Sequence, residues 1–411
     1  MKDFNYTKNI SKIKNCSLIF INTCGVKEQT ETKIIRFLRK IISEKIDCKK
    51  IIIYGCLVDI NKEKLKEEFP NIKLFSIKDK EQLQNLFKLK ISKSKKIKQK
   101  LTVPIIIANG CLGNCSYCAV KFARGKLKSK SISEIKNEIL VALEKGAKEI
   151  LLTAQDTVCY GFDINTNIIK LLKEILKIKK DFKIRLGMAN PKYLYKFKTD
   201  LIKIYKNKKM YKLIHMPIQS GSNRILKLMN RAYDAKLINN LALYFRNNIK
   251  DITIATDVII GFPTETQEEF LDTCKIIEKN KFDIVNISRF GKRKNTEASK
   301  YKDFEGRIKK QRSRIITKLC EDISLQNNSK YLGDKKEIII NEIGKNKTEI
   351  LGRSYEYKQI LIKDINKLGQ KQLLQQNQKQ LQQKDLKKYF GKKIKVKITD
   401  FKTYYLIGKI I

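Results

Sequence analysis

The sequence predicts an α/β protein that ends in a small β-barrel, and three observations lead to this fold class. Short apolar runs alternate with amphipathic helical segments over most of the chain, which is the pattern of parallel sheets. Polar stretches directly follow these runs, as the functional loops of parallel barrels follow their strands. The final part of the chain, residues 333–411, carries only short β-rich runs.

The first part of the chain, residues 1–95, is predicted to form a small doubly wound α/β domain with a parallel sheet. Strands are expected at residues 16–22, 49–55 and 72–77, and helices at 30–46 and 61–69. A basic stretch without periodicity, residues 88–100, is interpreted as a linker.

The middle part, residues 102–330, repeats the alternation over a longer span. Six strands are expected, at residues 103–108, 149–154, 183–188, 212–216, 252–261 and 282–288, with periodic helical segments between them. Six parallel strands with crossover helices fit an open (β/α)₆ barrel better than a flat sheet. An amphipathic helix is expected over about 305–330.

The last part, residues 333–411, is predicted to be a small β-barrel of the nucleic-acid-binding kind. A stretch rich in Gln, Lys and Leu, residues 367–384, interrupts its strands. Its composition is typical of a solvated, low-complexity insertion without chemistry of its own.

Composition restricts the class of protein further. The 411 residues include ten cysteines, one histidine and no tryptophan, and the formal net charge is +47. No apolar run is long enough for a membrane span or a signal peptide, so we expect a cytoplasmic protein without a membrane partner. Cytosolic thiols stay reduced, so clustered cysteines there bind metal more often than they pair. The charge indicates a polyanionic partner, with nucleic acid first, although compositional drift toward lysine accounts for part of it.

Three cysteines stand within eight residues at Cys111, Cys115 and Cys118, in the spacing C-x₃-C-x₂-C. A zinc site normally has four ligands in two pairs, and the only histidine, His215, lies far along the chain. Three thiolates on a [4Fe–4S] cluster leave one iron open for a ligand. We interpret the motif as the radical S-adenosylmethionine (SAM) signature, with a zinc or purely structural site as the alternative. Tyr117 adds an apolar neighbour for the cofactor.

Further motifs resemble the radical SAM methylthiotransferases over nearly the whole chain. FINTCGVKEQTETKI (20–34) and YGC (54–56) are similar to the N-terminal domain of that family, and NGCLGNCSYCAVKFARG, HMPIQSGSNRILKLMNRAY and TDVIIGFPTET to its radical domain. ILGRSYEYKQILIK and KKIKVKITDF are similar to its C-terminal TRAM domain. The residues of the cysteine motifs are most similar to those of the archaeal and eukaryotic branch of the family. The resemblance implies that SAM is cleaved to a radical, and that a methylthio group is added to carbon 2 of N6-threonylcarbamoyladenosine at position 37 of tRNA.

By the same resemblance, Cys24 and Cys56 are two of three ligands of a second, auxiliary [4Fe–4S] cluster. Each follows a predicted parallel strand, so both should lie at the same edge of the sheet. The family's third ligand lies upstream of Met1, and we expect a truncated record rather than a protein that has lost its first strand. Five further cysteines are expected to be ordinary buried thiols, the first two at the opposite edge of the sheet: Cys16, Cys48, Cys159, Cys274 and Cys320.

The resemblance also implies residues that line the cofactor and substrate, namely Gln155, Asp156, Gln219, Ser222, Arg231 and Gly261. Gln155 and Asp156 would receive the amino group of SAM, and the missing side chain of Gly261 would let the backbone approach its adenosine. A strand-end turn is the alternative for Gly261, a surface position for Arg231 and a core position for His215. No catalytic residue is identified.

Arg353 and Tyr355 are the expected RNA contacts of the C-terminal barrel, with a plain β-turn as the alternative. The resemblance implies tRNA and an electron donor as partners and leaves the sulfur source open. Three other functions remain: methylthiolation of isopentenyladenosine in tRNA, methylthiolation of a ribosomal-protein aspartate, and tRNA binding without methylthiolation after loss of the N-terminus.

Overall fold

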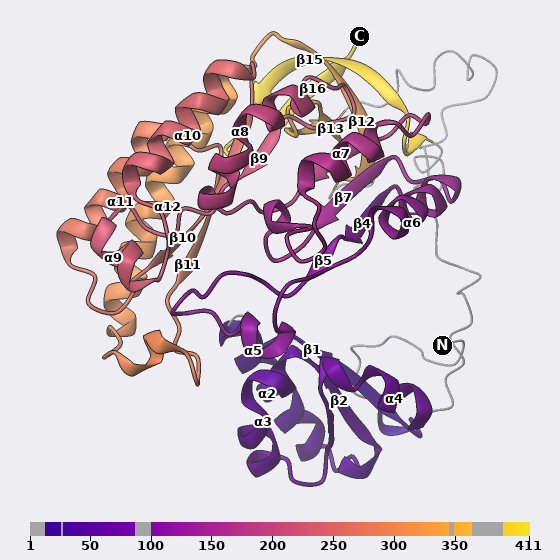
Figure 1. Ribbon diagram of the computed structural model, residues 1–411, viewed down its shortest axis with the longest axis vertical. Helices are drawn as coiled ribbons and strands as arrows, with labels where there is room; N and C mark the ends of the chain where they lie inside the picture. The colour runs from indigo at the N-terminus through magenta and orange to yellow at the C-terminus, as the bar shows by residue number, and fades with distance from the viewer. Residues whose placement is uncertain (1–12, 26–27, 87–99, 345–348, 364–388) are drawn as a thin grey trace. The chain divides into compact units, whose positions relative to one another are not determined.

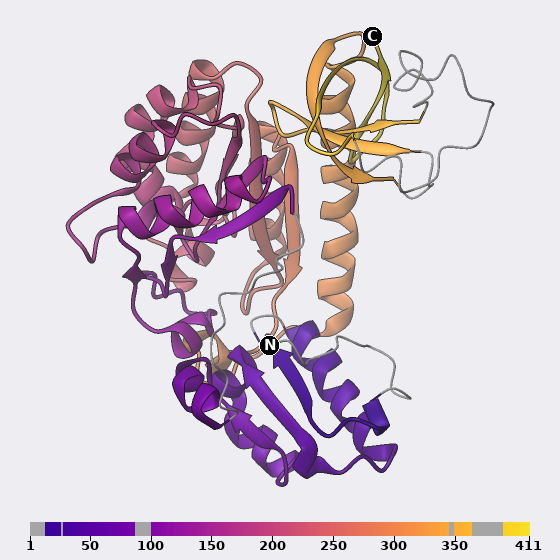
Figure 2. The same cartoon turned by 90° about the vertical axis from the view of Figure 1, so that its right-hand side faces the viewer.

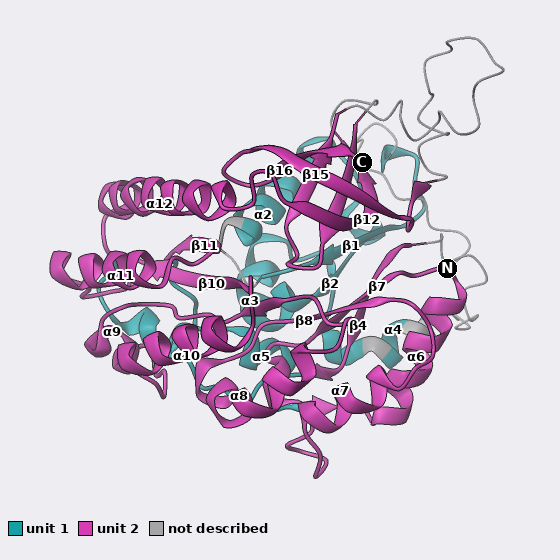
Figure 3. Ribbon diagram, turned by 90° about the horizontal axis from the view of Figure 1, so that it is seen from above, with its two compact units in different colours: residues 1–98, 109–127, 291–303 teal, residues 99–108, 128–290, 304–411 magenta. Residues whose placement is uncertain are grey.

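The computed structural model describes residues 13–25, 28–86, 100–344, 349–363 and 389–411 (Figure 1). Two compact units divide the chain (Figure 3). Unit 1 consists of residues 1–98, 109–127 and 291–303, and unit 2 consists of the remaining residues. The cysteine loop at 109–127 therefore belongs to the same unit as the N-terminal sheet. The boundaries drawn from the sequence at 1–95, 102–330 and 333–411 follow a different division and stay a prediction.

Unit 1 is built on a parallel sheet in the order β1-β2-β3. Its strands are β1 (Ile19–Thr23), β2 (Ile51–Gly55) and β3 (Lys73–Phe75), and its helices include α2 (Glu28–Ser43), α3 (Cys56–Glu68), α4 (Lys80–Leu86) and α5 (Val120–Arg124). Leu38, Ile41 and Leu57 are fully buried in its core, as the helical spacing of the apolar residues predicts. The expected α/β domain on a parallel sheet of three strands is confirmed.

Two polar contacts attach the distant segments of unit 1 to each other. The Nη1 atom of Arg293 lies 2.7 Å from Oε2 of Glu31 on α2, and both side chains are almost completely buried. The backbone N–H of Ala298 donates to the carbonyl oxygen of Ser116 in the cysteine loop at 2.9 Å. Residues 291–303 thus contact both α2 and the cysteine loop.

Unit 2 contains the six expected parallel strands. They form two three-stranded sheets, β4 (Thr102–Ile106), β7 (Glu149–Thr153) and β8 (Lys183–Leu186) in one, and β9 (Leu213–His215), β10 (Thr253–Ile260) and β11 (Ile284–Arg289) in the other. A parallel bridge between Met188 and His215 joins the two where β8 and β9 end. The order β4-β7-β8-β9-β10-β11 follows the chain, as an open (β/α)₆ barrel requires.

The helices of unit 2 return the chain between these strands (Figure 1). They are α6 (Ile132–Glu144), α7 (Ile168–Leu176), α8 (Pro191–Tyr205), α9 (Asn223–Leu228), α10 (Ala235–Asn248), α11 (Gln267–Asn280) and α12 (Gly306–Ser329). Local sequence sets where they begin. Ser131 and Thr266 form capping boxes with Glu134 and Glu269, and the Asp234 side chain caps α10.

The last strands close into a barrel in the order β12-β13-β14-β16-β15. These are β12 (Lys335–Ile343), β13 (Ile350–Ser354), β14 (Gln359–Ile362), β15 (Lys393–Phe401) and β16 (Leu406–Ile410). Figure 2 shows α12 passing along the parallel strands to this barrel. The insert at 367–384 lies outside the described residues, and so does the basic stretch 88–100 apart from Lys100. Among the described helices, none is long and apolar enough to cross a membrane.

The turn between β13 and β14 is attached to the amino ends of the parallel strands. The backbone N–H of Lys212 donates to the Tyr355 carbonyl oxygen at 2.9 Å, and the Thr253 hydroxyl donates to that of Glu356 at 2.6 Å. The Tyr355 ring lies under the Nζ atoms of Lys183 and Lys212, at 4.5 and 5.0 Å from its centroid. Tyr355 therefore packs against the parallel-strand part of unit 2, which sequence alone does not reveal.

Arg353 lies on β13, with its guanidinium 4.5 Å from the Tyr357 ring centroid. A role in RNA binding for Arg353 or Tyr355 stays a prediction.

Candidate functional site

The three clustered cysteines lie on one loop of unit 1, and each is partly exposed. The backbone N–H of Gly113 lies 3.2 Å from the Cys111 sulfur, and the N–H of Cys118 donates to the Cys115 carbonyl oxygen at 3.1 Å. A Cβ atom at Gly113 would lie 3.3 Å from the Cys111 sulfur and 3.7 Å from the Cys115 sulfur. Both sulfur atoms therefore face Gly113, where a bulkier residue would crowd them.

Three thiols on one loop match in number the three thiolates that would hold a [4Fe–4S] cluster with one open iron. Within the described residues, no three His, Cys, Asp or Glu side chains converge as ligands of one ion. A [4Fe–4S] cluster does not require such convergence, because each thiolate binds a different iron atom. Cys111, Cys115 and Cys118 are all partly exposed residues.

Cys24 and Cys56 lie at the same edge of the unit 1 sheet. Thr23 and Gly55 are register partners on β1 and β2, and each cysteine directly follows one of them. Cys24 is exposed, whereas Cys56 is only 3% exposed. The predicted placement is confirmed by this register, while the role as cluster ligands is not tested.

Helix α5, which follows the cysteine loop, packs directly on Cys56. Ala119 and Ala123 share a buried cluster with Cys56, and Arg124 Nη2 lies 3.9 Å from the Cys56 sulfur. The guanidinium thus donates a hydrogen bond to the sulfur of Cys56. In the sequence, Arg124 carries no signal for this contact beyond being basic.

The other cysteines are less uniform than predicted. Cys159 is fully buried, and its thiol donates to Asp156 Oδ2 at 3.0 Å. The expectation of full burial is wrong for the remaining four, which are partly exposed: Cys16, Cys48, Cys274 and Cys320. Cys16 and Cys48 do pack against the unit 1 core at the end of the sheet opposite Cys24 and Cys56. Burial raises the pKa of Cys274 to about 11 and that of Cys320 to about 12.

Asp156 follows β7 and is 5% exposed. Its carboxylate accepts hydrogen bonds from the backbone N–H groups of Val158 at 3.3 Å and Asn190 at 3.2 Å, besides the thiol of Cys159. Burial raises the pKa of Asp156, and these hydrogen bonds together with the positive charge of Arg231 oppose the increase. The carboxylate thus connects the loop after β7 to the loop after β8.

Gln155 offers an acceptor to a ligand. Its Oε1 atom is buried and accepts no hydrogen bond from the part of the protein that the structure describes. A buried acceptor without a donor costs about 1–3 kcal/mol, so a water molecule or a donor group of a ligand at this position would stabilise it. The amino group of SAM is a donor of this kind, and Gln155 fits it.

Gln219 and Ser222 lie in the loop after β9. Gln219 has φ of 69°, which is strained for a residue other than glycine, and its N–H donates to the Asp257 carbonyl oxygen at 2.8 Å. The Ser222 hydroxyl caps α9 and donates to Glu269 Oε1 at 2.8 Å. Ser222 therefore has a structural role in this loop, and its contact with a cofactor stays a prediction.

Gly261 ends β10 with φ of 65°. A Cβ atom there would lie 2.4 Å from Cγ of Lys309 on α12, so a side chain at this position would collide with that lysine. The Gly261 N–H donates to Glu265 Oε2 at 2.8 Å, and Glu265 pairs with Arg312 Nη1 at 2.6 Å. The strand-end turn thus accounts for the glycine, and its contact with the cofactor stays a prediction.

A row of polar side chains crosses the sheet of β9, β10 and β11. The sequence did not predict this row. His215 Nε2 lies 3.0 Å from Asp257 Oδ2, and Asn286 Nδ2 donates to Asp257 Oδ1 at 2.8 Å. The side chains of His215 and Asp257 are 14% and 26% exposed, so His215 is not a fully buried core histidine. An aspartate within the apolar run DVIIG was the available signal.

Comparisons with known proteins agree with this architecture. Residues 105–277 match the model of the Radical SAM superfamily, and residues 1–76 match "Uncharacterized protein family UPF0004". A relative from Pyrococcus abyssi, "Probable threonylcarbamoyladenosine tRNA methylthiotransferase", is 38% identical over 84% of this chain and 84% of its own length. A protein of the same name from Archaeoglobus fulgidus is 34% identical over 98% of this chain and 92% of its own.

The chain belongs to the radical SAM methylthiotransferase family. Among solved structures, the radical SAM methyltransferase TsrM from Kitasatospora setae shares the fold, with a TM-score of 0.51 and 11% identity, over 69% of this chain and 66% of that one. Membership of the family implies a [4Fe–4S] cluster and SAM. The motif-based resemblance and the fold class are thereby confirmed.

Proposed function

We propose that this methylthiotransferase adds a methylthio group to carbon 2 of N6-threonylcarbamoyladenosine at position 37 of tRNA, beside the anticodon. The observation that carries the proposal is the similarity to threonylcarbamoyladenosine tRNA methylthiotransferases over most of the chain. The net charge of +47 and the closed C-terminal barrel support an RNA substrate. Isopentenyladenosine in tRNA and a ribosomal-protein aspartate are the alternatives.

The residues of the chain take the following roles in this proposal. The thiolates of Cys111, Cys115 and Cys118 hold the [4Fe–4S] cluster, and Gln155 Oε1 accepts a hydrogen bond from the amino group of SAM. Asp156 keeps the loops after β7 and β8 in register through its hydrogen bonds to Cys159 and Asn190. When bound, the cluster and SAM together supply a radical that removes hydrogen from the substrate carbon.

Cys24 and Cys56 are proposed ligands of a second cluster, supported by their shared sheet edge and by Arg124 beside Cys56. Two thiols are fewer than the three or four that usually hold such a cluster, so the described residues fit it only in part. An electron donor is a proposed partner, because cleavage of SAM consumes an electron. With tRNA as its substrate, the enzyme would act in the cytoplasm.

The modified nucleosides of tRNA test the proposal. Nuclease digests of tRNA from cells that lack the gene should contain N6-threonylcarbamoyladenosine without its methylthio derivative, and mass spectrometry measures both. Accumulation of isopentenyladenosine without its methylthio derivative would instead assign the enzyme to the branch that acts on isopentenyladenosine in tRNA. An unchanged nucleoside profile with loss of a methylthiolated ribosomal-protein aspartate would contradict the tRNA assignment.

Iron content tests the two cluster sites separately. A Cys24→Ala/Cys56→Ala variant should lose the iron of the second site and keep the radical cluster, whose ligands are Cys111, Cys115 and Cys118. A variant with alanine at Cys111, Cys115 and Cys118 should lose reductive SAM cleavage and keep the iron bound at Cys24 and Cys56. This result would support both assignments. An unchanged iron content in the Cys24/Cys56 variant would contradict the second cluster.

A further inference from the structure

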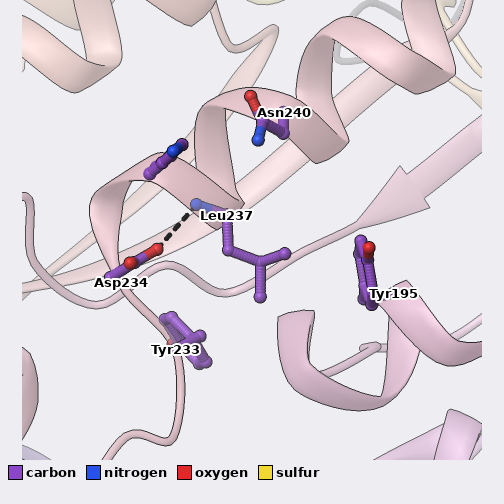
Figure 4. Close-up of a pocket in the computed structure, with 6 residues that line it drawn as sticks. Tyr195, Tyr233, Asp234, Leu237 and Asn240 are labelled. Atoms are coloured by element: carbon purple, nitrogen blue, oxygen red, sulfur yellow. Dashed lines mark hydrogen bonds between the residues drawn. The ribbon is translucent and has the colours of Figure 1, made fainter.

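A pocket of about 430 Å³ opens on unit 2, outside the residues assigned above (Figure 4). It lies between α8 and the start of α10, with the segment that joins α9 to α10 on one side. Leu237 lies between two tyrosines in this view. The lining residues are Tyr195, Tyr233, Asp234, Lys236, Leu237 and Asn240.

One wall of the pocket is bonded to the loop that follows β9. The Tyr233 hydroxyl donates to the Pro217 carbonyl oxygen at 2.9 Å and accepts from Arg231 Nε at 2.7 Å. The Arg231 guanidinium also lies 4.9 Å from the Tyr233 ring centroid. Because Pro217 belongs to the loop at the carboxyl end of β9, the pocket borders the face on which (β/α) barrels carry out their chemistry.

The chemistry of the lining selects a flat aromatic ligand that carries negative charge. Tyr195 is 49% exposed, an unusually open position for a large aromatic side chain, and Lys198 Nζ lies 4.0 Å from its ring centroid. Lys236 adds a second ammonium group at the rim. Oδ1 of Asp234 accepts the N–H of Leu237 at 2.7 Å as the helix cap.

Each part of this lining matches one part of a nucleotide. Unpaired bases of RNA stack on exposed aromatic rings, and lysines beside them bind the phosphates. The side-chain amide of Asn240 adds a donor and an acceptor of the kind that bind base edges. A purely apolar ligand would not use the ammonium group of Lys236, and a simple anion would not use the ring of Tyr195.

We propose that this pocket binds an unpaired nucleobase of the bound RNA, stacked on Tyr195, while the base to be modified occupies the catalytic face. The inference rests on the proposed function, since an anticodon loop offers several unpaired bases next to its target. It deepens that function by assigning a second base contact to a site with no part in cofactor binding.

Tyr195 variants of the full chain test the stacking contact. Fluorescence anisotropy with a labelled anticodon stem-loop, at one fixed salt concentration, should show Tyr195→Ala binding about 5- to 150-fold more weakly, which is the range for loss of one stacked base. Tyr195→Trp should keep the affinity of the original protein. Leu243→Ala is the matched control, because Leu243 is 60% exposed on α10 and does not line the pocket. Equal affinity of the Tyr195→Ala and Leu243→Ala variants would overturn the proposal.

Abasic substitutions identify the base. If one loop base occupies the pocket, an abasic nucleotide at that position should weaken binding to the original protein and leave binding to Tyr195→Ala unchanged. Additive effects at every loop position would overturn the proposal.

An unrelated single-stranded RNA separates this inference from the proposed function. Equal binding of both RNAs would contradict the tRNA substrate, whereas a Tyr195→Ala loss on both would still support the pocket.

Discussion

Lys358 connects the C-terminal barrel to the parallel-strand part of unit 2, and its removal should destabilise that unit. Its Nζ atom lies 2.9 Å from Asp283 Oδ1 and 3.2 Å from Asn328 Oδ1. Lys358 and Asp283 are each 9% exposed, so their charges are paired away from solvent. Lys358→Met keeps most of the apolar side chain and leaves the Asp283 carboxylate with fewer partners.

The size of the effect follows from what remains at Asp283. Breaking a buried ion pair by removing one partner typically costs about 3–5 kcal/mol. Asp283 would retain the N–H of Ile254 at 3.0 Å and the Arg246 guanidinium at 3.5 Å. Because two donors remain, we expect a loss near the lower limit, about 3 kcal/mol.

Urea unfolding followed by circular dichroism measures this loss, since the chain has no tryptophan for fluorescence. Lys409→Met is the matched control, because Lys409 is exposed on β16 and should change stability by less than about 0.5 kcal/mol. Adding Asp283→Asn to Lys358→Met should recover about 1–3 kcal/mol, because the buried carboxylate that has lost the Lys358 ammonium group is then neutral. A Lys358→Met variant as stable as the Lys409→Met control would refute the reasoning.

Three further predictions concern the cluster, pH and the insert. Replacing Cys111, Cys115 or Cys118 by Ala should abolish formation of 5′-deoxyadenosine by reduced protein, measured by chromatography, and full activity in any variant would contradict the ligand assignment. Hydrogen bonds from Arg224 lower the pKa of Glu269 from 4.5 to about 2, so the stability that its charge contributes is present above pH 4.5 and is lost as pH falls toward 2. Glu269→Gln should therefore show a smaller fall in melting temperature over that range, and equal slopes would contradict this. Deleting residues 367–384 should leave tRNA affinity within about twofold across a salt series, because the composition of the insert suits solvated chain, and a larger loss would assign it a role in binding.

The same contacts bear on how the barrel is tested. Deleting residues 335–411 would remove Lys358 and also the carbonyl acceptors of Lys212 and Thr253. A loss of RNA binding after that deletion would then combine lost contacts with lost stability. Substitutions on the barrel surface, such as at Arg353, separate the two effects.

Local sequence by itself determined the elements of this protein and its thiol motif. Alternation of apolar runs with amphipathic segments predicted the six parallel strands of unit 2 and the three of unit 1, because burial of one helix face or one strand is visible in the periodicity. The spacing of Cys111, Cys115 and Cys118 predicted a cluster, since three thiols on one short loop remain close in any fold. Cys24 and Cys56 could be placed at one sheet edge because both follow parallel strands.

Only the tertiary structure decided which distant side chains meet. Helix α12 brings Lys309 against Gly261, and Cys56 contacts Arg124 because α5 packs on α3. Tyr195 and Tyr233 line one pocket although they lie on different segments. Periodicity records whether a side chain is buried, but it carries no information about its partner. Partners depend on how crossover helices stack and on where the barrel docks, and these are set by packing between elements.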